Sequence, residues 1–247
     1  MFEWMKQHPF AVEAFFERSV VLTYAFPKEQ LEPFLPARLS LDTFQDETAF
    51  VAVAMVQTKS LRPKGFPRWL GRDFLLVGYR IFVRYESRAG KRLRGLYILK
   101  SETDRFFMKV FGNLFTHYRY SKVDVALRDE GSQTTVQSEV SGFVVTVERE
   151  EQDELPLPAG SPFANWKEAR RFAGPLPFTF SATPGSNRFV IIEGVRQNWK
   201  PRPVAVVEHH VPFVLSLTDE APTLASAFMT ENIPYAWKKG VIETWPE

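Results

Sequence analysis

The chain alternates between apolar runs of strand length and short polar segments that contain glycine or proline. Apolar runs rich in β-branched and aromatic residues, bounded by turn residues, are typical of strands. We therefore predict strands at residues 18–26, 48–58, 74–86, 93–101, 118–127, 134–148, 176–183, 188–196 and 204–210. Turn residues at 87–91, 129–132 and 184–187 connect neighbouring runs, which favours antiparallel hairpins.

Shorter segments predict helices between the strands, at residues 10–16, 28–35, 104–114, 164–172 and 222–228. In segment 104–114 the residues Phe107, Val110 and Phe111 follow helical spacing, and Asp104 stands at the N-cap position. Residues 61–73 contain two prolines and two glycines and are expected to form a loop, and 235–244 a mixed tail. The pattern predicts an α+β fold, mainly antiparallel, that closes toward a barrel.

The length of 247 residues lies within the range that barrels and sandwiches fill as one domain, so we expect a single domain over residues 1–247. The acidic, proline-containing stretch 148–162 is the candidate boundary, and we interpret it as a loop inside one sheet system. The 23 phenylalanines suit wide sheet faces and leave irregular gaps that can become pockets.

Composition narrows the functional classes. Cysteine is absent, which excludes zinc ribbons, iron–sulfur clusters and thiol nucleophiles and favours a reducing compartment. Charged residues interrupt segment 1–19, and no window approaches 18 apolar residues, so we expect a cytoplasmic protein with no membrane partner. The net charge of +2 gives no sign of a nucleic-acid partner. Nucleotide, α/β-hydrolase and zincin motifs are absent from the sequence.

Several segments of the first half carry a family resemblance, namely 22–27 (LTYAFP), 34–36 (FLP) and 39–44 (LSLDTF). Later segments agree in kind and order, namely 79–83 (YRIFV), 95–101 (GLYILKS), 115–118 (FTHY) and 210–213 (HVPF). Together they resemble the YqjF-like family of uncharacterised bacterial proteins, which belongs to the acetoacetate decarboxylase-like superfamily. The resemblance implies a cone-shaped antiparallel barrel with a central pocket and short flanking helices.

The same resemblance speaks against the decarboxylase chemistry. Decarboxylases of the superfamily carry a lysine pair after this helix, and one lysine forms a Schiff base with a β-keto acid. Here Thr116, His117 and Tyr118 hold the matching positions, and an imidazole has no primary amine. The assisting carboxylates are also missing, because segments 51–54 and 76–78 contain no acid. Schiff-base decarboxylation is therefore not expected, although Lys122 or Lys100 could supply a displaced amine.

His117 and Tyr118 are the candidate catalytic residues, since the resemblance brings them into the pocket and histidine transfers protons near neutral pH. The alternative is a pair packed under the barrel rim. Arg80 and Arg84 are four residues apart on one predicted strand, so they share a face and could clamp a carboxylate. If that face is exposed, they form a charged surface instead.

Glu193 interrupts an apolar strand and could pair with an inward arginine, or mark the solvent face. His210 could structure the pocket wall or lie at a sheet edge, and its neighbour His209 would point to the opposite face, so we expect no metal site. The basic, aromatic loop 61–73 resembles single-strand nucleic-acid binders, yet a flap over the barrel mouth fits a near-neutral protein better.

The sequence therefore predicts a barrel that binds a small organic acid or carbonyl compound, with Arg80, Arg84, Glu193, His210 and Lys122 as ligand contacts and no cofactor. A lyase or isomerase that uses His117 as acid–base is one alternative. A non-catalytic interaction or regulatory barrel is the other, and a homo-oligomer stays open.

Overall fold

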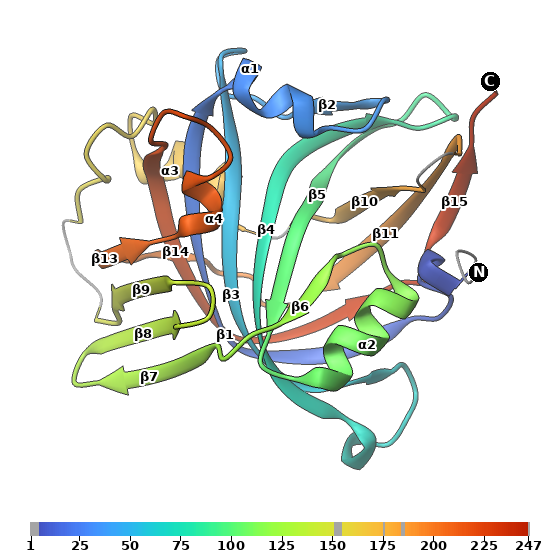
Figure 1. Ribbon diagram of the computed structural model, residues 1–247, viewed down its shortest axis with the longest axis horizontal. Helices are drawn as coiled ribbons and strands as arrows, with labels where there is room; N and C mark the ends of the chain where they lie inside the picture. The colour runs from blue at the N-terminus through green and yellow to red at the C-terminus, as the bar shows by residue number, and fades with distance from the viewer. Residues whose placement is uncertain (1–4, 151–154, 175, 184–185, 247) are drawn as a thin grey trace.

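A computed structural model describes residues 5–150, 155–174, 176–183 and 186–246 (Figure 1). Two sheets make up the strands. The larger sheet is built on β1 (Val12–Pro27), β3 (Thr48–Pro63), β4 (Arg72–Glu86), β5 (Arg92–Thr103), β10 (Phe178–Ala182), β11 (Arg188–Arg196) and β14 (Thr223–Trp237). Four short strands extend it, namely β2 (Leu39–Leu41), β6 (Tyr120–Lys122), β12 (Arg202–Pro203) and β15 (Val241–Thr244).

The larger sheet curls until its pairings form a ring. The strand order β14-β1-β3-β4-β5-β10-β11 is completed by an antiparallel pairing of β11 with β14, in which Gly194 to Arg196 oppose Tyr235 to Trp237. The pairing of β5 with β10 is parallel and also joins three residue pairs, whereas β1 and β3 pair along nearly their whole lengths. The predicted α+β, mainly antiparallel fold is confirmed.

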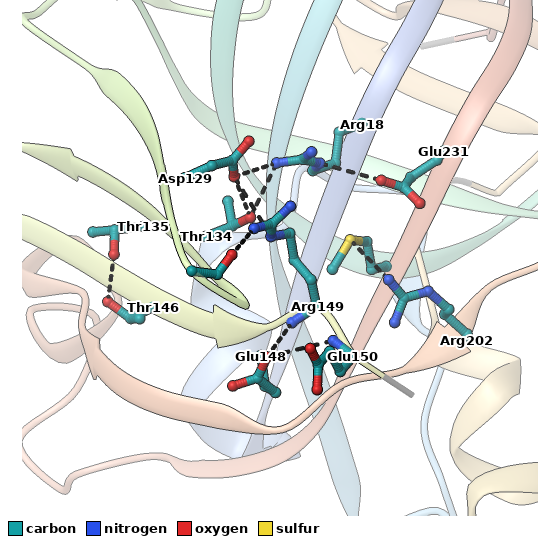
Figure 2. A network of polar contacts seen from close by, with 12 residues as sticks. Arg18, Asp129, Thr134, Thr135, Thr146, Glu148, Arg149, Glu150, Arg202 and Glu231 are labelled. Carbon is teal, nitrogen blue, oxygen red and sulfur yellow. Dashed lines mark hydrogen bonds and ion pairs between the residues drawn. The ribbon is translucent and has the colours of Figure 1, made fainter. Parts of the chain in front are cut away.

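The smaller sheet lies beside the curled sheet, at the left of Figure 1, in the order β13 (Val206–His210), β9 (Phe143–Glu148), β8 (Gln133–Ser138), β7 (Ala126–Glu130). A polar network attaches it to β1 and β14 (Figure 2). Arg18 of β1 contacts the Asp129 carboxylate at 2.7 Å, the Thr134 hydroxyl at 3.0 Å and the Glu231 carboxylate at 3.4 Å. Burial raises the pKa of Asp129, but Thr134 and Arg18 lower it more, and the net pKa lies below its usual value.

Short helices lie between the strands. These are η1 (Met5–Gln7), α1 (Lys28–Leu31), η2 (Glu32–Phe34), η3 (Arg68–Leu70), α2 (Phe106–Phe115), α3 (Trp166–Ala169), η4 (Arg170–Phe172) and α4 (Pro212–Leu215). Helix α2 packs on β6 and η1, at the lower right of Figure 1. At another part of the ring Phe172 of η4 packs against Phe50 and Phe82.

Alternation along each strand divides the apolar side chains between two cores. On β4 the residues Val77, Tyr79 and Ile81 belong to the core shared with the smaller sheet. Leu76 and Phe82 belong to the second core, with α2 and η4. Arg80 lies on this second face and interacts electrostatically with Tyr235 of β14, which is separated from β4 by β1 and β3. We call this second face the concave face.

Two predicted helices are wrong. Of the predicted helices 10–16 and 222–228, residues 12–16 belong to β1 and residues 223–228 to β14, and these two strands pair with one another. Phe15 and Phe16 of the first segment oppose Pro234 and Ile233 of β14. Tertiary pairing thus overrides a short local pattern that also fits a helix.

Smaller differences concern boundaries. Predicted strand 118–127 divides into β6 and β7, and 134–148 divides into β8 and β9, while predicted loop 61–73 is partly taken up by the ends of β3 and β4. Asp104 does not cap α2; its carboxylate accepts a hydrogen bond from the Leu75 amide at 2.8 Å instead. The predicted turn 184–187 and stretch 148–162 lie partly outside the described residues.

Candidate functional site

The end of α2 delivers two tyrosines to the concave face. The Thr116 hydroxyl donates to the Gly112 carbonyl at 2.7 Å and ends the helix. Asn113 then holds the backbone of Tyr120 through two hydrogen bonds of 2.8 and 2.7 Å. Gly112 is needed here, because a Cβ at this position would lie 2.4 Å from the Tyr120 ring. Tyr118 and Tyr120 are consequently fixed inside the second core.

Arg80 occupies the middle of this face. Its guanidinium folds back over Gly78, where a Cβ would lie 2.9 Å from Nε and from Nη2. The residues opposite on β3 are also small, with Ala52 paired to Arg80 and Ala54 paired to Gly78. Three small side chains therefore leave room for one long, charged one.

The guanidinium of Arg80 has no hydrogen bond or ion pair to any residue that the structure describes, and Nε is fully buried. Burial lowers the pKa of Arg80, and the nearby phenols of Tyr235, Tyr120 and Tyr118 raise it. Arginine stays protonated under such conditions, so a positive charge is held on the concave face. The side chain nevertheless keeps part of its surface accessible, which indicates unfilled space beside it.

The surrounding phenols stay neutral. Burial is the first cause that raises the pKa of Tyr118, Tyr120 and Tyr235, and the charge of Arg80 only partly offsets it. The Tyr118 hydroxyl faces Thr179 of β10 but makes no hydrogen bond of normal geometry. Neutral phenols can donate to an anion beside Arg80, but they cannot neutralise the arginine themselves.

Two clefts open at the same end of the ring, where β3 meets β4. We call the first the apolar cleft; it has a volume of about 890 Å³, and its lining includes Leu76, Phe107, Met108, Tyr118 and Tyr120. We call the second the basic cleft; it has a volume of about 800 Å³, and its lining includes Lys59, Lys64, Arg68, Tyr235 and Lys238. Arg62 and Trp237 line both clefts. Residues of the 61–73 segment thus border both openings.

Arg84 shares the face of Arg80, as predicted, but it is already paired. Its Nε contacts the fully buried carboxylate of Asp42 at 2.8 Å. Arg94 and Arg171 bind the same carboxylate, Arg171 at 3.1 Å. Arg80 and Arg84 therefore do not form a pair of free guanidinium groups.

The other predicted site residues are not brought together. His117 is half-buried and lines neither cleft, and Lys122 is exposed on β6. His210 is exposed on β13, and Glu193 forms a surface ion pair of 2.8 Å with Lys238. Lys100 lies on the convex face, where its ammonium contacts the buried Glu102 carboxylate at 2.6 Å.

Sequence reasoning missed Tyr120, Tyr235 and Gly78. Tyr120 follows Tyr118 by two residues, so strand alternation could have placed it on the same face. Tyr235 fell in a segment expected to be a mixed tail, and no local signal marked it. Across the described ranges the structure brings no group of three histidines and carboxylates into a geometry for a metal ion, and no helix is long and apolar enough to cross a membrane.

A comparison with models of known families assigns the chain to one of them. Residues 14–237 match the model of DUF2071, described as "Uncharacterized conserved protein (COG2071)". The chain belongs to this family. No curated protein matches this DUF2071 chain.

Solved structures share the fold of this DUF2071 protein. Acetoacetate decarboxylase from Legionella pneumophila superposes with a TM-score of 0.64 at 12% identity, over 96% of this chain and 88% of that one. An acetoacetate decarboxylase-like enzyme from Sphingomonas wittichii gives a TM-score of 0.57 at 12% identity, over 97% and 94%. The enduracididine biosynthesis enzyme MppR, complexed with pyruvate, gives 0.58 at 10% identity, over 95% and 90%. The DUF2071 chain thus has an acetoacetate decarboxylase-like fold.

Proposed function

We propose that this protein binds a small organic acid or carbonyl compound on the concave face of the ring, with the acid group of the ligand against Arg80. The observation that supports this most strongly is a buried guanidinium without a counterion among the described residues. A buried charge that lacks a partner costs several kcal/mol, on the order of 3–5, so proteins retain it where a ligand supplies the opposite charge.

The chemistry around Arg80 suits a carboxylate. A guanidinium binds a carboxylate through two parallel hydrogen bonds. Neutral Tyr118, Tyr120 and Tyr235 add hydroxyl donors around the same point, and no carboxylate of the described chain competes for it. One relative by fold, MppR, has been solved with pyruvate bound, which shows that this architecture can hold a small keto acid.

The proposal assigns binding, not Schiff-base chemistry. The residues after α2 are Thr116, His117 and Tyr118, and Lys100 lies on the other side of the sheet. The proposal retains Arg80 as the ligand contact expected from the sequence, and it assigns Tyr118, expected as a catalytic residue, a hydrogen-bonding role together with Tyr120 and Tyr235. His117 is not assigned a contact with the ligand, because it lines neither cleft and is not among the groups that interact with Arg80.

The variant Arg80→Met distinguishes a role of Arg80 in ligand binding from a role in stabilising the fold. We expect Arg80→Met to weaken carboxylate binding by about tenfold to a hundredfold, measured by calorimetry with pyruvate and benzoate against benzyl alcohol. We also expect the free protein to become more stable by about 1–4 kcal/mol, because an unpaired buried charge is removed.

The matched control is Arg92→Met, an exposed arginine of β5 with no ion pair to any described residue. It should change neither binding nor stability. If Arg80→Met binds acids as well as the wild type, or if no acid binds the wild type, the proposal is wrong.

A further inference from the structure

We propose that the ligand is an amphipathic carboxylic acid, whose carboxylate meets Arg80 and whose hydrocarbon or aromatic tail fills the apolar cleft. This inference rests on the proposed function and specifies the ligand class. Arg80 itself lines neither cleft, so the inference depends on a continuous path from the guanidinium to the apolar cleft.

The path runs along the concave face of β4. Arg80 does not extend away from the cleft; its guanidinium lies over Gly78, on the side of Leu76 and Phe74. Those two residues line the apolar cleft, and each step of two residues along a strand covers about 7 Å. Tyr118 and Tyr120 connect the two regions from the other side, since both line the cleft and both interact with Arg80.

The size and lining of the cleft exceed the needs of a small keto acid. A volume of about 890 Å³ lies at the upper end of the usual range for ligand sites, roughly 300–1,000 Å³. Its walls are mainly hydrocarbon and aromatic surface, including Phe74, Leu76, Met108 and Trp237. A molecule with a charged group alone would leave these walls in contact with water.

The rim of the cleft is also apolar. Phe10, Leu70 and Phe111 line the cleft and are 37%, 38% and 53% exposed. Large exposed hydrophobic side chains that gather at an opening mark a binding site for an apolar group. Of the three arginines in the lining, Arg62 is paired with Glu13 and Arg105 with Asp104, whereas Arg72 has no ion pair to a described residue and can attract an acid that approaches the rim.

The basic cleft is the competing place for a ligand. Its lining carries Lys64 and Arg68, which have no ion pair to a described residue, and Lys59 and Lys238, which are paired with carboxylates, so it suits an anion better than the apolar cleft does. An amphipathic acid is therefore expected in the apolar cleft and a polyanion in the basic cleft, and the experiment can distinguish these two sites.

The test is calorimetric titration of the full-length protein with straight-chain acids from butanoate to dodecanoate, below the concentration at which they aggregate. We expect affinity to rise by about fourfold per added methylene, equivalent to ~0.8 kcal/mol, until the cleft is filled. Dodecanol, which has the tail without the charge, should bind at least about tenfold more weakly than dodecanoate.

Two variants of α2 form a matched pair. Phe111→Glu places a charge in the lining of the apolar cleft, whereas Phe106 is 63% exposed on the same helix and lies outside that lining. Phe111→Glu should weaken dodecanoate binding by about tenfold or more and leave butanoate unchanged, while Phe106→Glu should change neither. Melting temperatures of both variants confirm that they fold.

The outcomes distinguish the two proposals. If butanoate binds and affinity stays flat with chain length, or if Phe111→Glu has no effect on dodecanoate, the amphipathic ligand is excluded and acid binding at Arg80 stands. If dodecanol binds as tightly as dodecanoate, the role of Arg80 is excluded and the apolar site stands. If Lys64→Met, in the lining of the basic cleft only, weakens dodecanoate binding as much as Phe111→Glu does, the tail occupies the basic cleft and the inference is wrong.

Discussion

At the scale of single residues, the site depends on small side chains as much as on charged ones. Arg80 can lie across the concave face because Gly78, Ala52 and Ala54 leave the space beside it. Of these residues only Arg80 was prominent in the sequence, since charge stands out in an apolar strand. A glycine within a strand gives no local sign of which side chain crosses it.

We expect Gly78→Ala to displace the guanidinium without unfolding the protein. The new Cβ would lie 2.9 Å from two nitrogens of Arg80, and this flexible end can move away. Stability should change by no more than about 1 kcal/mol, since alanine is also less costly than glycine in a strand. Acid affinity should fall about tenfold, because the donors are no longer aligned.

A double-mutant cycle with Arg80→Met provides the control for Gly78→Ala. In the Arg80→Met background the alanine should cause no further loss of binding. An equal loss in both backgrounds would show that Gly78 acts on the ligand by another route.

At the scale of elements, one buried carboxylate joins four of them. Asp42 follows β2 and receives Arg84 from β4, Arg94 from β5 and Arg171 from η4. Arg84 was predicted to face the ligand because its spacing from Arg80 is correct. Its partner lies 42 residues away in the sequence, and no spacing rule connects the two.

We expect Asp42→Ala to lower the free energy of unfolding by about 3–5 kcal/mol, because three arginines lose their shared partner. Arg84→Met removes one of three cations and leaves Asp42 paired, so its cost should be smaller, about 1 kcal/mol. Denaturant unfolding measures both. Equal costs for the two variants would contradict a shared role of Asp42.

Strands could be predicted where a long run of apolar residues lies between clear turn residues in the sequence. Strands β3, β4, β5 and β11 were found because β-branched and aromatic residues fill them between clear turns. The first part of β1 and the start of β14 were taken for helices, since seven residues fit either period. Their strand identity comes from the antiparallel pairing of β1 with β14, in which each segment opposes the far end of the other strand, about 200 residues away, and local reasoning cannot detect this.

At the scale of the whole molecule, His8 ties the N-terminal segment to two distant parts. Its amide donates to the Phe115 carbonyl at 3.0 Å, and its carbonyl accepts from the Gly240 amide at 2.9 Å. Burial lowers the pKa of the His8 imidazole, against smaller effects of backbone hydrogen bonds that raise it. Burial also lowers the pKa of His209, with a further contribution from His210.

The lowered pKa of His8 sets the direction of the pH dependence. Above pH 6.5 the imidazole is neutral in both the folded and the unfolded state. Below pH 6.5 the unfolded state takes up the proton first, so stability falls as pH decreases, by up to about 1.4 kcal/mol per pH unit for each such histidine. Unfolding curves between pH 7.5 and 5 should show a shallower slope for His8→Gln; superimposed slopes would contradict a buried neutral His8.

The division of the chain into domains, the compartment and the oligomeric state stay predictions. The family and the acetoacetate decarboxylase-like fold were predictable because short motifs recur in the family order, at 22–27, 79–83 and 210–213 among others. The clefts were not, since each is formed by segments far apart in the sequence.

The two short pairings that complete the ring, β5 with β10 and β11 with β14, have a consequence for its dynamics. Apart from four residue pairs with β15, the β10–β11 hairpin is joined to β5 by three residue pairs and to β14 by three more, whereas β1, β3 and β4 share long ladders. A unit with so few bridges can detach at a lower free energy than the rest of the protein unfolds. Transient detachment of this hairpin would expose one side of the concave face, while the long strands β1, β3 and β4 hold Arg80 in position.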